Sequence, residues 1–149
     1  MARYAVAGRS TIAGTSLRPN VSLYATAAVT PRVMEVGIFN TTATAAAYSL
    51  CRLTAAGTQG VGLTEIAVSD SLQTAIATGF AGHTADLTGA QSSNNPVRQA
   101  SLGAAIGAGV IWTFVEPGLV IPAGTANGIG ILVPTGTGQI IDYYIEWVE

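Results

Sequence analysis

The last forty residues, 110–149, constrain the fold of this chain more than any other stretch. Three apolar runs lie there, at residues 110–115, 129–133 and 140–148, and segments rich in Pro and Gly separate them. Pro and Gly supply the backbone angles that tight turns require. Short apolar runs divided by such turns are typical of strands. The closing stretch therefore predicts an antiparallel β sandwich.

The last of these runs also indicates which of its side chains are buried. Its residues alternate with a period of two, and that period places successive side chains on opposite faces of a strand. We expect one face to lie in the core and the other to point outward. The residues predicted to share one face are Ile141, Tyr143, Ile145 and Trp147. The residues predicted for the other face are Asp142, Tyr144, Glu146 and Val148.

The rest of the chain has the same rhythm of short strands and turns. Further candidate strands lie at residues 3–8, 21–27, 33–40, 45–53, 63–68 and 97–105. Within the third of these, Met34, Val36 and Ile38 are predicted to share a face. The resulting number of strands, seven to nine, is typical of an all-β antiparallel sandwich or jelly roll. We divide the chain into residues 1–20, an N-terminal arm or first strand, and residues 21–149, the jelly-roll domain.

Two stretches are less regular. Residues 69–77 fit a short helix, with Ser69 as its cap and Leu72 and Ile76 four positions apart, but they also fit a short strand. Residues 79–96 are mostly small and polar, and they predict a long surface loop. Loops of this kind often carry binding functions.

Charged residues are scarce in this sequence. They make up 9% of the chain, whereas about 25% is usual in globular domains. Few charges leave a free monomer poorly protected against self-association, so we expect other chains to cover much of its surface. The formal net charge of −2 provides no basic stripe for nucleic acid. No uninterrupted apolar run reaches the 18 or so residues of a membrane span. We expect neither nucleic acid nor a membrane as partner.

Residues that could catalyse a reaction or bind a metal are few. The single histidine, His83, lies in the predicted loop, and we interpret it as an ordinary loop residue. The single cysteine, Cys51, lies in an alternating strand, where a small buried side chain is the simplest interpretation. Metal sites gather several ligands, whereas the acids of this chain are scattered. We predict no catalytic residue, no cofactor and no metal.

Three arginines near the N-terminus are the candidate contact residues. Arg3, Arg9 and Arg18 all precede the first acidic residue, Glu35. A guanidinium pairs well with a carboxylate through two parallel hydrogen bonds. The three arginines could therefore attach the chain to an acidic protein surface, and a solvated chain end is the alternative.

Three segments near the C-terminus carry a resemblance to a known group of proteins. They read EPGLVIPAG (116–124), NGIG (127–130) and DYYIEW (142–147). Together they resemble the small jelly-roll proteins of tailed-bacteriophage virions, in particular capsid decoration (cement) proteins. The closing hairpin also resembles the tumour necrosis factor-like jelly roll, which commonly forms trimers.

The resemblance implies a structural role without catalysis. It implies a homotrimer that lies on the capsid surface of a virion and clamps neighbouring copies of the major capsid protein together, after synthesis in the host cytoplasm. In that setting Arg3, Arg9 and Arg18 would be capsid or inter-subunit contacts.

Two other functions stay open at this point. The chain could be a binding module of a phage tail or fibre that recognises host glycan through Trp112 or the loop at 79–96. Core packing is nevertheless the default interpretation of Trp112, and the glycan platform is the alternative. A small β-sandwich enzyme is the third hypothesis, and the scarcity of His, Cys and clustered acids disfavours it.

Overall fold

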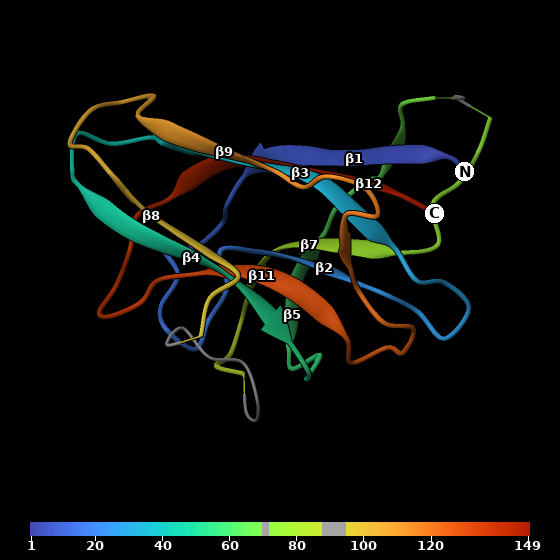
Figure 1. Cartoon of the computed structure of the whole chain (residues 1–149). Coiled ribbons are helices and arrows are strands. Elements are labelled where there is room, and N and C mark those ends of the chain that lie inside the picture. The colour runs from blue at the N-terminus through green and yellow to red at the C-terminus, as the bar shows by residue number, and fades with distance from the viewer. Residues whose placement is uncertain (70–71, 88–94) are drawn as a thin grey trace.

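The computed structural model describes residues 1–69, 72–87 and 95–149, and these form two antiparallel sheets packed face to face (Figure 1). The described residues contain no helix. The predicted all-β class and antiparallel two-sheet arrangement are confirmed.

The first sheet, named sheet I, has the strand order β10–β3–β12–β1–β6, and β9 pairs with β3 beside β10. Its strands are β1 (Arg3–Arg9), β3 (Arg32–Asn40), β6 (Ile66–Ala67), β9 (Gly109–Thr113), β10 (Leu119–Val120) and β12 (Ile141–Val148).

The second sheet, sheet II, has the order β5–β7–β2–β11–β4–β8. Its strands are β2 (Val21–Tyr24), β4 (Ala46–Leu53), β5 (Gln59–Gly62), β7 (Thr78–His83), β8 (Arg98–Leu102) and β11 (Gly128–Leu132).

Strands that are far apart in the sequence pair in a nested order. In sheet I, β1 pairs with β12 and β3 pairs with β9. In sheet II, β2 pairs with β11 and β4 pairs with β8. Each sheet therefore contains strands from both halves of the chain, so neither half can complete a sheet alone.

β12 lies in the middle of sheet I, between β1 and β3, and it alternates as predicted. Its buried residues are Ile141, Tyr143, Ile145 and Trp147. The ring of Trp147 stacks on Tyr4 of β1, with ring centroids 5.9 Å apart. Burial of a large apolar side chain contributes about 1.5–3 kcal/mol to folding. This row is therefore a main source of the stability of the sandwich.

β3 departs from the predicted alternation at Met34. The register of β3 against β12 shifts by one residue near this position. Such a β-bulge moves the side chains beyond it to the other face of the sheet. Val33 is therefore buried with Val36 and Ile38, whereas Met34 is only partly buried. The prediction that Met34 shares their face is wrong, because a period of two assumes an unbroken strand.

Sheet II is covered on both faces. Its inner face packs against sheet I. A second apolar cluster consists of Tyr24, Cys51, Leu53, Leu132 and Leu87, and Leu87 comes from the segment after β7. Cys51 is buried as predicted, and burial raises the pKa of its thiol to about 11. The thiol is therefore protonated and unreactive at neutral pH.

The stretch predicted as a loop at 79–96 begins as a strand. β7 reads TGFAGH, and its two glycines hide the alternation that would mark a strand. Gly82 has a φ of 85°, a conformation that interrupts the regular pleat before His83. His83 is therefore the buried last residue of a strand, and its interpretation as a loop residue is wrong.

Two predictions fall partly on positions that the structure does not describe. In the stretch 69–77, the described residues form no helix, and residues 70–71 lie outside the described part of the chain. Residues 88–94 of the predicted loop lie outside it as well.

Candidate protein-binding face

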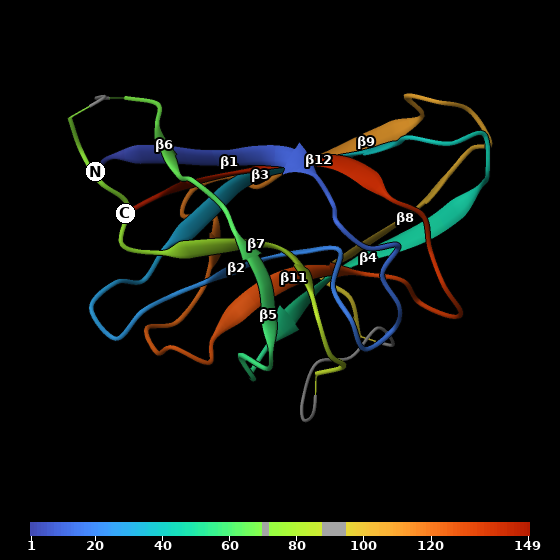
Figure 2. The ribbon, with the colours of Figure 1, turned by 180° about the vertical axis from the view of Figure 1, so that it is seen from behind.

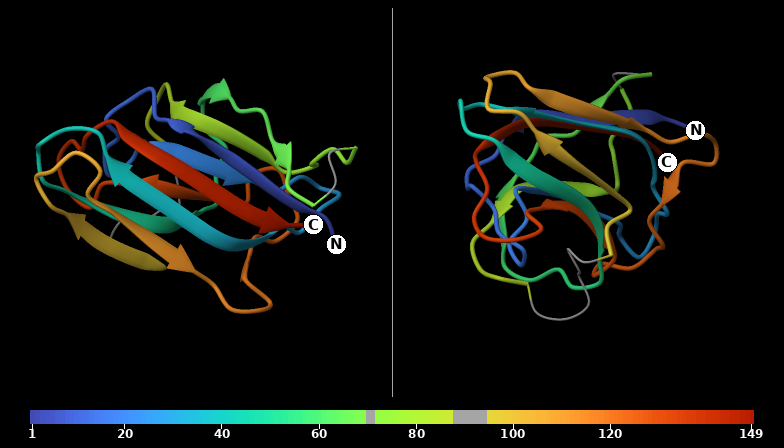
Figure 3. Two further views of the ribbon diagram at one scale, coloured as in Figure 1. Left: turned by 90° about the horizontal axis from the view of Figure 1, so that it is seen from above. Right: turned by 60° about the vertical axis from the view of Figure 1, so that its left-hand side comes forward.

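The outer surface of sheet I is formed by four adjacent strands, in the order β1, β12, β3 and β9 (Figure 3, left). Because alternate residues of these strands fill the core, the remaining residues point away from it. We call these residues the sheet I face. They are Arg3, Ala5, Ala7 and Arg9 of β1, Asp142, Tyr144, Glu146 and Val148 of β12, Glu35, Gly37 and Phe39 of β3, and Ile111 and Thr113 of β9.

The centre of the sheet I face is aromatic. Tyr144 stacks on Phe39, with ring centroids 6.3 Å apart and ring planes inclined by 25°. Gly37 lies opposite Tyr144, and a Cβ at Gly37 would stand 2.1 Å from the Cε1 atom of the tyrosine ring. Glycine is therefore required for the ring to lie across β3. On the other side of β12, Ala5 and Ala7 add only small side chains to this surface.

A hydrogen bond holds the Tyr144 ring in place. Its hydroxyl donates to Oε1 of Glu35 over 2.6 Å. Partial burial raises the pKa of Tyr144 to about 12, and the hydrogen bond and the charge of Glu35 act in the same direction. The phenol is therefore protonated at neutral pH and stays a donor. The sheet I face presents Tyr144 in one fixed orientation.

Two ion pairs connect β1 to β12 on the same face. Arg9 donates two hydrogen bonds to Asp142, of 2.7 Å from Nε and 3.0 Å from Nη2. Arg3 pairs with Glu146. The hydrogen bond from Arg9 lowers the pKa of Asp142, and the same contact raises the pKa of Arg9. Exposed pairs of this kind contribute little to stability, so their main effect here is a polar rim without net charge.

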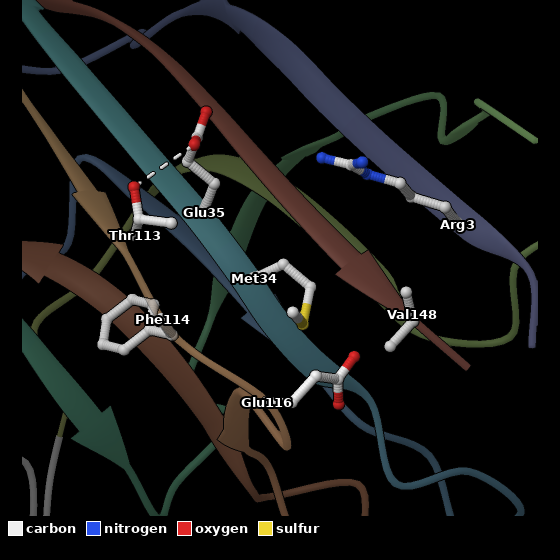
Figure 4. A pocket seen from close by; sticks show the side chains of 7 residues that line it. All are labelled: Arg3, Met34, Glu35, Thr113, Phe114, Glu116 and Val148. Carbon is white, nitrogen blue, oxygen red and sulfur yellow. Dashed lines mark hydrogen bonds between the residues drawn. The ribbon is translucent and has the colours of Figure 1, made fainter.

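A hollow of about 260 Å³ opens on this side of sheet I, beside the bulge at Met34 (Figure 4). Its lining residues are Arg3, Met34, Glu35, Thr113, Phe114, Glu116 and Val148. Figure 4 shows the side chain of Met34 at the middle of the hollow, between Glu35 and Glu116. An apolar floor with carboxylates beside it suits an apolar or basic side chain of a partner protein.

The structure brings together two of the three predicted contact residues. Arg3 and Arg9 both lie on the sheet I face. Arg18 lies in the loop before β2 and pairs with Asp86, with 2.8 Å between Nη2 and Oδ1. Asp86 precedes Leu87 of the second apolar cluster, which places Arg18 on the side of sheet II. All three arginines have an acidic partner within the chain, and residues 3–9 pair with β12 along their whole length.

Sequence reasoning missed the aromatic centre of this face. It placed Tyr144 on the outward side of the last strand but attached no contact to it, and it gave Phe39 no role. The available signal was the outward row of that strand, where a tyrosine stands between the acids Asp142 and Glu146. Its stacking partner comes from a strand about a hundred residues earlier, and sequence alone gives no such pairing.

His83 and Ser22 form a buried pair in sheet II. Nε2 of His83 lies 2.9 Å from Oγ of Ser22. Nδ1 of His83 has no hydrogen-bond partner among the described residues. Burial lowers the pKa of His83 to about 4, so its ring is neutral at pH 7. A catalytic triad would need a carboxylate to orient the ring, and no described carboxylate bonds to this histidine.

Three other kinds of site were considered from the sequence: a metal site, a membrane span and a glycan platform at Trp112. Among the described residues, no group of three or more His, Cys, Asp or Glu side chains is arranged to hold a metal ion. The described residues also contain no helix that could span a membrane. Trp112, the candidate glycan platform, is 8% exposed and packs in the core, so its ring is not available for stacking on a sugar.

Comparison of the chain with protein-family models, with curated protein sequences and with solved structures finds no match.

Proposed function

We propose that the chain is a structural protein of a tailed-phage virion, which binds the surface of the assembled capsid as a homotrimer and stabilises the shell. The observation that carries the proposal is the sheet I face, with its aromatic centre of Phe39 and Tyr144 beside a rim of paired charges. We assign this face to the contact with the major capsid protein. The mechanism requires no catalytic residue, cofactor or metal.

The sheet I face has the composition of a protein interface. Interface cores are enriched in aromatic residues and depleted of charge, and their rims are polar. Gly37 and the hydrogen bond to Glu35 hold Tyr144 in one orientation, so binding would cost little side-chain entropy. The hollow beside Met34 offers a place for one side chain of the partner.

We also propose that the two sheets form a jelly roll, and the nested strand pairing supports this. A jelly roll is a double sheet of eight strands, and in the present chain the outermost pair of strands encloses the next pair. We interpret the eight strands as β1, β2, β3, β4, β8, β9, β11 and β12. The low charge content supports the homotrimer, because few charges leave a surface poorly protected against self-association. Three of the six arginines are already paired within the chain, so even fewer charges stay free to oppose it.

Stabilisation of the shell follows from mass action. A protein that binds only the assembled lattice adds its binding free energy to the stability of that state. Three linked copies bind more tightly than one, because the first contact raises the local concentration of the other two. A trimer placed between capsid subunits would clamp them without any chemical reaction.

Co-sedimentation with emptied, expanded phage capsids tests the proposal. We expect the wild type to co-sediment and Tyr144→Ser to bind about tenfold more weakly or worse, as for an aromatic hot spot. The matched control is Leu17→Ser, which removes an exposed apolar side chain beside Arg18, away from the sheet I face. Circular dichroism checks that each variant keeps its β signal.

Two results would count against the proposal. A wild type that fails to bind capsids contradicts decoration. Equal binding by Tyr144→Ser and the wild type removes the sheet I face from the mechanism.

A further inference from the structure

Two chain segments close the lateral sides of the sandwich. The first contains β5 and β6 and runs from an edge of sheet II to an edge of sheet I (Figure 2). The second contains β8 and β9 and does the same on the opposite side (Figure 1). In sheet II, β5 and β8 are the two edge strands. In sheet I, β6 lies at one edge, and β9 pairs with β3 at the other.

Exposed large apolar side chains gather on these two segments. We name the β5–β6 flank by Val61, Ile66 and Val68, and the β8–β9 flank by Ile106, Ile111 and Val115. Each of the six side chains is at least 51% exposed. Ile111 also belongs to the sheet I face, so the β8–β9 flank adjoins that face.

The edge strand of the β8–β9 flank is open to pairing. β9 pairs with β3 on one side, and no strand of the described residues pairs with its other side. The N–H of Phe114 donates to the carbonyl of Met34, so the odd-numbered residues of β9 direct their backbone groups away from β3. β9 contains no charged residue and no Pro, the usual devices that keep edge strands from pairing.

One residue of the β5–β6 segment, Glu65, and one of the β8–β9 segment, Arg98, carry opposite charges without an ion-pair partner among the described residues. Glu65 lies in the segment between β5 and β6, and its carboxylate accepts a hydrogen bond of 3.0 Å from the N–H of Gly79. Arg98 begins β8, and its guanidinium carbon lies 5.2 Å from the centre of the Phe114 ring. Neither residue belongs to an ion pair of the described chain.

We propose that the β5–β6 flank of one copy of the chain binds the β8–β9 flank of the next copy. The inference rests on the proposed homotrimer and names the surfaces through which its copies bind. A head-to-tail contact brings Glu65 near Arg98 of the neighbouring copy. A two-fold contact would instead bring like charges together, which is unfavourable at an interface. The opposite charges of Glu65 and Arg98 therefore favour the head-to-tail arrangement.

The surface area of the chain is sufficient for such contacts. A protein interface of standard size buries about 800 Å² on each partner. That area is about one eighth of the 6560 Å² exposed by the monomer. A copy in a closed ring would use both flanks, about a quarter of its surface, and most of the sheet I face would stay free for the capsid.

Mixing two flank variants tests the inference. Ile66→Asp and Ile106→Asp each place a charge at an exposed position, on the β5–β6 flank and the β8–β9 flank respectively, so both variants should fold. Alone, each should sediment as a monomer. Mixed in equal amounts, they should form a dimer, because each variant retains the flank that the other has lost. Leu17→Asp, on neither flank, is the control and should sediment like the wild type.

Charge reversal provides a second, independent measurement. Arg98→Glu should weaken self-association about tenfold, because it places two carboxylates together across the contact. Adding Glu65→Arg in the same chain restores the opposite charges and should recover the association. Circular dichroism on both variants separates loss of contact from loss of fold.

The outcomes separate the flank contact from the proposed function. If either flank variant stays an oligomer, or the mixture yields no dimer, the flank contact is wrong, while a trimeric wild type that binds capsids keeps the proposed function. Open chains of the wild type, together with a dimer from the mixture, support the flank contact and contradict the trimer. A wild type that is monomeric at micromolar concentration overturns the trimer and the flank contact together.

Discussion

Acid should weaken the folded state through His83. Burial lowers its pKa to about 4 in the folded protein, whereas a histidine in an unfolded chain titrates near pH 6.5. Between these two values the unfolded state binds a proton that the folded state does not bind. The free energy of unfolding therefore decreases as the pH falls from about 6.5 to about 4.

The expected loss of stability is about 3 kcal/mol. One proton contributes about 1.4 kcal/mol per pH unit, and the interval spans about 2.5 units. The surroundings of the ring explain the shift. Ser22 already bonds to Nε2, and Nδ1 has no partner among the described residues. The ring of Tyr24 lies 6.1 Å away, measured between ring centroids. None of these groups compensates for a buried positive charge.

Urea unfolding at fixed protein concentration between about pH 7 and about pH 4 measures this effect. His83→Gln is the comparison, because glutamine does not titrate. We expect the wild type to lose about 3 kcal/mol more than the variant over this interval. Both proteins contain Asp142, whose lowered pKa adds its own loss at low pH, so that contribution cancels in the difference. Equal losses in the two proteins would refute the assignment to His83.

Substitutions at three further positions have defined outcomes. Trp147→Ala should lower the free energy of unfolding by about 3–5 kcal/mol in urea, and a variant as stable as the wild type would contradict the core position of the indole. Gly37→Ala places a Cβ where the Tyr144 ring lies, so capsid co-sedimentation should weaken while the β signal stays; unchanged binding would mean that the ring makes no contact. Glu149→Ala leaves three N–H donors without their acceptor and should cost about 1–3 kcal/mol in thermal or urea unfolding. Glu149→Gln retains an acceptor oxygen, so it should cost less, and equal losses would argue against these bonds.

The sequence predicts strands that have the core on one side and an outer surface on the other, because their apolar and polar residues alternate. β12 has the core on one side and an outer surface on the other, so its alternation is visible without any partner strand. The core position of Trp112 follows for the same reason, since β9 also has exposed residues on its outer side. Cys51 is buried on the other side of sheet II, within the second apolar cluster. β7 was missed because glycines occupy two of its six positions and erase the pattern.

Features that depend on pairing between distant strands could not be predicted. The bulge at Met34 arises from the register of β3 against β12, and the sequence of β3 alone contains no sign of it. The acidic partners of Arg3 and Arg9 lie more than 130 residues away along the chain. The stacking of Phe39 on Tyr144 also joins residues from distant strands, so sequence alone does not show it. The candidate face therefore becomes visible only when the strand order is known.

The nested pairing also determines when the protein can fold during its synthesis. Arg3 of β1 pairs with Val148 of β12, so sheet I lacks its central strand until residues 141–148 have been added. At about 5–20 residues per second, a ribosome needs about 7–30 s to pass from β1 to the end of β12. For most of this time, strands destined for the core remain exposed to water. Proteins with such distant pairings also fold slowly, within milliseconds to seconds. Chains interrupted before residue 141 would lack β12 and present no complete sheet I face, so under the proposed function they would not bind the assembled capsid.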